Sequence, residues 1–96
     1  MKSLPEIKAA LTLHKAELFR KYHLKELGIF GSVSRGETTS DSDIDILIDY
    51  EGSMGLEFID LAEELELILN NKVDLVSKQA LKPKLLSRIQ VDLKYV

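Results

Sequence analysis

This 96-residue chain has no cysteine, no tryptophan and only two prolines. Without cysteine it can form neither a disulfide framework nor a thiolate zinc site, which fits a reducing cytoplasm. No apolar run approaches the ~18 residues that a membrane-spanning helix needs. Residues 1–15 are typical of a charged helix and lack the apolar region of a signal peptide. We therefore expect a single small cytoplasmic domain over residues 1–96, with a modest core and no membrane contact.

Positive charge is missing from the middle of the chain. Residues 37–71 contain eleven Asp or Glu and no Lys or Arg, whereas residues 1–36 carry seven Lys or Arg and three Glu, and residues 72–96 carry six Lys or Arg and two Asp. The plain interpretation of such a block is a solvated acidic face, and the alternative is a centre that needs a metal ion or a basic partner. Because the chain is acidic overall, with a net charge of −3, we do not expect it to bind nucleic acid directly.

Helical and strand periodicities alternate along the chain. A capping box at Ser3 and Glu6 predicts a helix to about Tyr22, helical spacing predicts a second helix over about 56–70, and Pro83 opens a third helix to about 89 or 90. Short apolar runs predict strands over 27–30, 44–50 and 73–77, and a single helical turn is expected over 33–38. The last six residues fit either a short strand or a partner-docking end.

Two aspartates stand at the head of the second predicted strand. Asp43 and Asp45 lie on the same face of an extended chain, with Cα atoms ~7 Å apart. Two carboxylates ~6.5 Å apart repel by ~2.5 kcal/mol at an effective dielectric of ~20. A divalent cation that prefers oxygen ligands, Mg²⁺ above all, would relieve this repulsion.

A Gly-Ser turn precedes these aspartates. Gly31 and Ser32 fall where the first predicted strand passes into a helical turn, and backbone N–H groups at such a junction attract phosphate oxygens. The next residues do not form a Walker A loop or a dinucleotide fingerprint. Arg35 either reaches a phosphate with its planar guanidinium or pairs with a local carboxylate, and the sequence leaves both open.

A third carboxylate lies in the third predicted strand. Asp74 is flanked by Val73 and Leu75, which favours a central strand. If that strand lies beside the second one, three carboxylates meet and match two-metal phosphoryl transfer, with ions ~3.5–4 Å apart.

Two serines lie in the loop before Asp43: Ser42 is a candidate nucleotide contact, and Ser40 is better explained as a loop cap.

The pattern GS-x-x-RG-x-x-x-x-x-SD-I-D over residues 31–45 resembles the signature of the nucleotidyltransferase superfamily related to DNA polymerase β. The short length is similar to that of the minimal nucleotidyltransferase (MNT) subgroup, and Asp74 in VDLV matches the third carboxylate of the family. The resemblance implies an α/β fold with a small mixed sheet of three or four strands and helices on one side. It further implies that Gly31 and Ser32 bind the nucleotide phosphates, and that Asp43, Asp45 and Asp74 hold Mg²⁺, two ions in all.

Members of this size typically act as antitoxins paired with a HEPN-domain ribonuclease toxin. The resemblance therefore implies transfer of AMP from ATP to a tyrosine hydroxyl of such a toxin. Larger members carry a second domain that 96 residues cannot accommodate, so a partner protein would have to complete the site. Two alternatives stay open: an antitoxin that neutralises its partner by binding alone, and an enzyme acting on a small molecule, similar to aminoglycoside nucleotidyltransferases.

Overall fold

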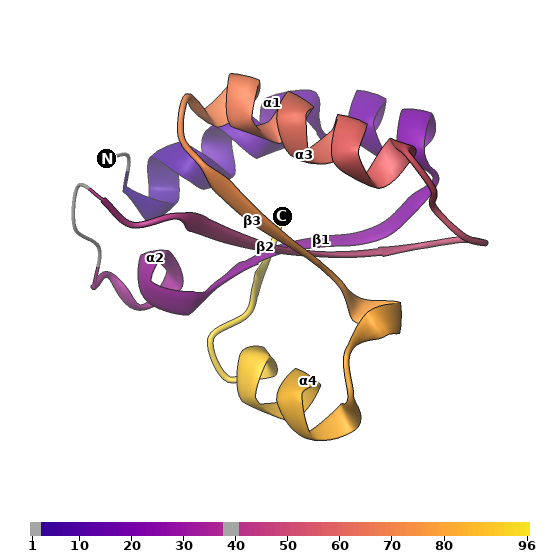
Figure 1. Cartoon of the computed structure of the whole chain (residues 1–96). Helices are drawn as coiled ribbons and strands as arrows, with labels where there is room; N and C mark the ends of the chain where they lie inside the picture. Colours follow the sequence, from indigo (N-terminus) through magenta and orange to yellow (C-terminus); the bar gives the residue numbers. More distant parts are fainter. Residues whose placement is uncertain (1–2, 38–40) are drawn as a thin grey trace.

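The computed structural model describes residues 3–37 and 41–96, and its centre is a four-stranded sheet with the strand order β3-β2-β1-β4 (Figure 1). The α/β fold predicted from the sequence, a mixed sheet with helices, is confirmed. The elements are, in chain order, α1 (Leu4–Tyr22), β1 (Leu24–Phe30), α2 (Gly31–Arg35), β2 (Ile44–Tyr50), α3 (Glu57–Leu69), β3 (Val73–Ser77), the 3-10 turn η1 (Lys78–Ala80), α4 (Pro83–Gln90) and β4 (Lys94–Tyr95).

The helix ends follow local signals in the sequence. Ser3 caps α1, and the reciprocal bonds with Glu6 form the predicted capping box. The residues that cap the C-termini of α1 and α3, His23 and Asn70, are both in the left-handed conformation, with φ of 54° and 49°. Because His23 turns the chain at once, β1 begins at Leu24, three residues earlier than predicted.

The sheet is mixed because its connections differ in length. β1 pairs antiparallel with β2 and with β4, whereas β2 and β3 are parallel and α3 connects them. The prediction that β3 is a central strand is wrong: β3 lies at the edge of the sheet. Val73 and Leu75 are apolar because they pack against the main core, so the apolar residues around Asp74 reflect one covered face and not a neighbouring strand on each side.

The main core lies between the sheet and the two long helices, which cover one face together (Figure 1). Ile44, Ile46 and Ile48 of β2 are fully buried on this face, as their alternation predicts. They belong to one cluster with the buried side chains of α1 and α3, which are Ile7, Leu11, Leu18, Leu61, Leu65 and Leu69. Burial of this apolar surface is the main driving force for the fold.

The opposite face of the sheet is covered only in part. The short helix α4 lies on this side (Figure 1), and the Leu93 side chain lies so close to Gly28 that a Cβ atom there would be 2.6 Å from Leu93 Cδ1. Gly28 is the register partner of the fully buried Leu47. Of the two alternatives for the C-terminal residues, the structure shows a strand: β4 pairs with β1 and forms the second edge of the sheet. Within the described ranges, no helix combines the length and the apolar character needed to cross a membrane.

Candidate active site

Asp45 and Asp74 lie side by side on the two neighbouring strands β2 and β3. They are register partners in the parallel pair, and their side chains are hydrogen-bonded to each other. Register partners of adjacent strands share a face and lie ~4.8 Å apart. Since Ile44 and Ile46 turn toward the helices, both carboxyl groups lie on the opposite face. The predicted meeting of these two residues is present in the structure.

Burial and like charge raise the pKa of Asp45 to about 6. The largest cause is burial, followed by the charge of Asp74, the hydrogen bond to Asp74 and the charge of Asp43. The positive charge of Arg35 acts in the other direction and lowers this pKa. Asp43 itself is exposed and precedes β2. The site thus places a partly buried carboxyl group next to two other carboxyl groups of the same charge.

Gly31 is required at the point where α2 approaches Asp45. Its φ is +74°, and a Cβ atom would lie 2.1 Å from Asp45 Oδ2 and 3.0 Å from its Cγ. Any side chain at residue 31 would displace the carboxyl group. The Gly-Ser turn and the aspartate, fourteen positions apart in the sequence, are therefore in direct contact.

The first turn of α2 lies beside this contact. Its N-cap residue, Phe30, makes no side-chain capping bond, and the Ser32 hydroxyl makes no hydrogen bond to any described residue. The helical turn comprises residues 31–35, earlier than the predicted 33–38, of which residue 38 lies outside the described part. The Ser32 hydroxyl is thus a donor next to Gly31.

Arg35 pairs with local carboxylates, which is one of the two alternatives that the sequence left open. Its Nε donates to Glu37 at 3.1 Å, and its Nη1 donates to Asp92 at 2.6 Å. The hydrogen bond to Asp92 and, after it, the hydrogen bond to Glu37 raise the pKa of Arg35. The guanidinium remains close enough to the carboxyl pair to lower the pKa of Asp45.

A depression of about 340 Å³ opens beside Asp43. Asn71 Nδ2 donates to the Ser42 carbonyl oxygen at 3.3 Å and to that of Lys72 at 2.9 Å, which holds the approach to β2 in place. Ser40 lies outside the described residues. The depression is lined by Asp41, Ser42, Asp43, Asn71 and Lys72.

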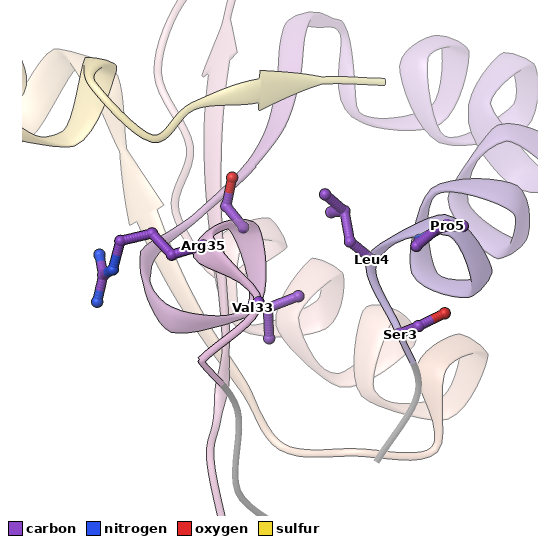
Figure 2. A pocket seen from close by; sticks show the side chains of 7 residues that line it. Ser3, Leu4, Pro5, Val33 and Arg35 are labelled. Carbon is purple, nitrogen blue, oxygen red and sulfur yellow. The ribbon is translucent and has the colours of Figure 1, made fainter.

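A second cavity, of about 440 Å³, lies between the start of α1 and α2 (Figure 2). None of the three aspartates lines it. Its lining combines apolar side chains with the hydroxyls of Ser3 and Ser34. The residues around it are Ser3, Leu4, Pro5, Val33, Ser34, Arg35 and Gly36.

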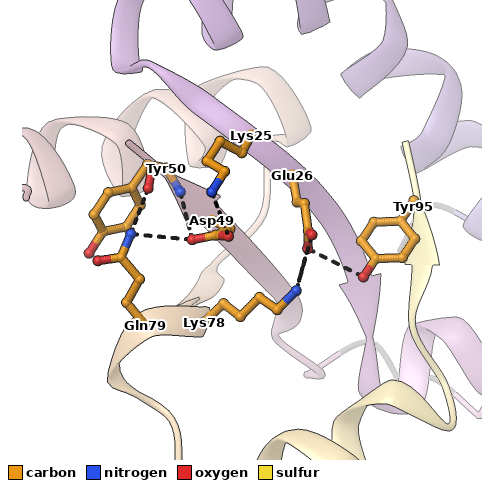
Figure 3. A network of polar contacts seen from close by, with 7 residues as sticks. All are labelled: Lys25, Glu26, Asp49, Tyr50, Lys78, Gln79 and Tyr95. Carbon is orange, nitrogen blue, oxygen red and sulfur yellow. Dashed lines mark hydrogen bonds and ion pairs between the residues drawn. The ribbon is translucent and has the colours of Figure 1, made fainter. Parts of the chain in front are cut away.

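Asp49 lies on the same strand and face as Asp45 but is neutralised by its neighbours (Figure 3). It accepts hydrogen bonds from the Tyr50 N–H at 2.9 Å and from Gln79 Nε2 at 3.3 Å, and it forms an ion pair with Lys25 at 3.9 Å. Only 15% of its side chain is exposed. From its place farther along the strand, the sequence predicts that Asp49 is a surface or partner-facing charge. This prediction is wrong, because the 3-10 turn after β3 places Gln79 against it.

The carboxylate chemistry fits a hard divalent cation. Within residues 3–37 and 41–96, no group of three or more Asp, Glu or His side chains is already arranged to hold a metal ion. Burial, and after it the negative charges of Asp74 and Asp43, raise the pKa of Asp45, and a bound cation would offset both the buried charge and this repulsion. The donor set of carboxylate oxygens is the one that Mg²⁺ prefers.

Two features of the site could not be found from the sequence. Asp92 is 57 residues from Arg35, and Asn71 is 29 residues from Ser42. Neither belongs to a motif, and no periodicity connects them to the residues that they contact. Both pairings arise only because the sheet brings separate loops to one end.

Comparisons with known proteins agree with this geometry. The model of a nucleotidyltransferase domain matches residues 12–96. The protein adenylyltransferase MntA of Thermococcus cleftensis is 44% identical over 97 residues, which cover 100% of this chain and 98% of the relative. The sequence similarity therefore extends over almost the whole length of both chains.

Solved structures share the same fold. A protein assigned as a minimal nucleotidyltransferase superposes with a TM-score of 0.77 at 30% identity, covering 94% of this chain and 95% of the other. A toxin-antitoxin complex crystallised with AMP-PNP contains a chain that superposes with a TM-score of 0.73 at 27% identity, covering 86% of this chain and 69% of that one. The match of the domain model over most of the sequence and the relative of equal length lead to one conclusion: the chain belongs to the nucleotidyltransferase domain family.

Proposed function

We propose that this chain is the antitoxin of a toxin-antitoxin pair and transfers AMP from ATP to a tyrosine hydroxyl of a HEPN-domain ribonuclease toxin. The observation that carries the proposal is the hydrogen-bonded pair of Asp45 and Asp74, which lies against Gly31 with a raised pKa at Asp45. Partly buried carboxyl groups of perturbed pKa are typical of catalytic sites. The similarity to a protein adenylyltransferase of equal length supports the same activity.

The nucleotide would bind at the junction of β1 and α2. Gly31 would allow close approach of a phosphate, and the Ser32 hydroxyl and the first N–H groups of α2 would donate to it. Arg35 adds a positive charge at the end of α2, and Ser42 lies at the neighbouring depression. ATP is the donor that the family relationship favours.

Asp43, Asp45 and Asp74 would hold Mg²⁺ through carboxylate oxygens. When bound, this ion would supply charge stabilisation for the phosphoryl oxygens and lower the pKa of the acceptor hydroxyl. Mg²⁺ binding would be favoured because the cation would offset the repulsion between Asp45 and the neighbouring carboxylates.

In the reaction, the phenolic oxygen of the acceptor forms a bond to the α-phosphorus, and the bond from that phosphorus to the bridging oxygen of pyrophosphate breaks. Pyrophosphate leaves, and AMP remains on the tyrosine as a phosphodiester. The phenolic proton would pass to the carboxylate of Asp74, which lies beside Asp45 on the neighbouring strand. Atoms and charge balance without a further reactant.

The test is transfer of labelled AMP from ATP to a purified HEPN-domain partner. Replacing Asp43 and Asp45 by Asn is expected to slow transfer at least ~10³-fold, because ~4 kcal/mol of transition-state stabilisation is lost. Asp60→Asn, a matched change on the exposed face of α3, should leave the rate unchanged. Undiminished transfer by the double variant would refute the assignment.

The same variant decides the alternative function. If the protein neutralised the ribonuclease by binding alone, the Asp43→Asn, Asp45→Asn variant would still suppress RNA cleavage, and ATP would not be needed. The catalytic proposal requires that suppression depends on ATP and that it is lost with these two carboxylates.

A further inference from the structure

The C-terminal segment is joined directly to the turn that would bind the nucleotide. Asp92 follows α4, and its carboxylate accepts the 2.6 Å bond from Arg35 Nη1. The backbone carbonyl of the same residue accepts a hydrogen bond from the Ser34 hydroxyl. Two consecutive residues of α2, Ser34 and Arg35, are thus bonded to one residue that lies 58 and 57 positions farther along the chain.

Helix α2 needs such an external support. It has five residues, and a helix of this length is not stable by itself because the cost of nucleation is not recovered. Val33, which is almost fully buried, fixes one side of it to the core. On the other side of the helix, Ser34 and Arg35 are hydrogen-bonded to Asp92.

Asp92 can act as a support because the sheet holds the segment around it. The Leu93 side chain lies over Gly28 of β1, and the Val96 N–H donates to the Leu27 carbonyl at 2.9 Å. β4 pairs with β1 directly beyond Asp92. The segment that carries Asp92 is therefore attached to β1, the strand that ends directly before Gly31.

Two hydrogen bonds orient the guanidinium of Arg35, and some of its N–H donors are not used by them. Arg carries five N–H donors, and the bonds to Glu37 and Asp92 use Nε and Nη1. Asp92 is the stronger of the two partners, since its bond is shorter and its side chain is 22% exposed, against 65% for Glu37. With Nε and Nη1 engaged by these two bonds, the N–H groups of Nη2 are left to donate to a phosphate.

We propose that Asp92 is a positioning residue for nucleotide binding: through Arg35 and Ser34 it holds the guanidinium and the α2 turn where the β- and γ-phosphates of ATP bind. The inference rests on the proposed function only in taking ATP as the ligand. The positive charge of Arg35 also acts on the site itself, since it lowers the pKa of Asp45. The two alternatives for Arg35, phosphate contact and carboxylate pairing, then involve different N–H groups of one side chain.

The experiment compares binding of MgATP and MgAMP by titration calorimetry, because AMP lacks the β- and γ-phosphates. The proteins are the wild type, Asp92→Asn, Arg35→Lys, the double variant, and Asp60→Asn as a remote control. Asp92→Asn is expected to weaken ATP binding about 5- to 20-fold, as for loss of a charge-assisted hydrogen bond, and to change AMP binding less than about twofold. Because Asp92 acts through Arg35, the double variant should bind ATP no more weakly than Arg35→Lys alone.

Three results would overturn the positioning role. Equal loss of ATP and AMP affinity would show that Asp92 only stabilises the fold, and thermal unfolding of each variant would confirm it. Independent, multiplicative losses in the double variant would show that Asp92 does not act through Arg35. Tighter ATP binding by Asp92→Asn would show that the carboxylate competes with phosphate. A wild-type protein that binds MgATP but transfers no AMP would refute the proposed function, while the ratio of ATP to AMP affinity would still decide the role of Asp92.

Discussion

Strand β2 carries an aspartate near each end, Asp45 and Asp49, on the same face of the sheet. The charges around these two aspartates have opposite signs. At one end, Asp49 accepts two hydrogen bonds and pairs with Lys25, next to a second group in which Lys78 bonds Glu26 at 3.0 Å and Tyr95 donates to Glu26 at 3.3 Å (Figure 3). At the other end, Asp45 is half-buried beside Asp74 and near Asp43, and its pKa is raised to about 6.

This difference separates structural from functional acidic residues. A carboxylate with donors and a cation around it stabilises the fold modestly, because its charge is compensated. A carboxylate held against others of the same sign costs stability, and a fold retains such an arrangement where it serves binding or catalysis. The acidic block of residues 37–71 contains both kinds.

The largest effect should follow from placing a methyl group between the turn and Asp45. Gly31→Ala is expected to reduce AMP transfer by at least about 10²-fold, because the new Cβ would overlap Asp45 Oδ2 and a misplacement of ~1 Å costs this much in catalysis. Gly52 is the matched control, since it has a similar φ of +73° with nothing within 4 Å of the added Cβ. Gly52→Ala should cost stability of ~1 kcal/mol for the left-handed conformation and leave transfer unchanged. Equal activity of the two variants would show that the contact at Gly31 does not matter for catalysis.

The next effect is a pair of changes in stability with opposite sign. Asp45→Asn removes a repelled charge, so the metal-free protein at pH 7.5 should melt about 2–6 °C higher, the range for gains of up to ~1 kcal/mol in a domain of this size. Asp49→Asn removes the charge that faces Lys25 and should lower the melting temperature by a few degrees or less, as expected for a partly exposed ion pair. Differential scanning calorimetry without divalent ions measures both. A decrease in both variants would contradict the distinction between the two ends of β2.

The smallest effect concerns pH. Because the folded pKa of Asp45 is about 6, above its ordinary value of 3.8, the folded state binds a proton that the unfolded state has released between these two values. The contribution of Asp45 therefore makes the metal-free protein less stable as pH rises through about 6, and more stable as pH falls toward 4. The difference in unfolding free energy between wild type and Asp45→Asn, measured with urea from pH 4.5 to 7.5, should follow this direction. A difference that does not vary with pH would show that the pKa of Asp45 is not raised.

Much of the fold was predictable because it depends on local pattern. The capping box at Ser3, the left-handed end at Asn70 and the alternation of Ile44, Ile46 and Ile48 each require only neighbours in the sequence. The order of the strands was not predictable, since periodicity does not encode which strand pairs with which. The misassignment of β3 as central shows this limit, because Val73 and Leu75 are equally apolar at an edge that is covered on one face.

The sequence alone determined which side chains could do chemistry: the spacing of Asp43 and Asp45, the Gly-Ser turn before them and a third carboxylate in Asp74. Tertiary structure decided which of them meet. The parallel pairing of β2 and β3 placed Asp45 against Asp74, the left-handed Gly31 brought the turn onto Asp45, and the closing of the sheet by β4 brought Asp92 to Arg35. The physical reason is that sequence pattern fixes the face on which a side chain lies, whereas the partner on that face is chosen by packing between segments distant in the chain.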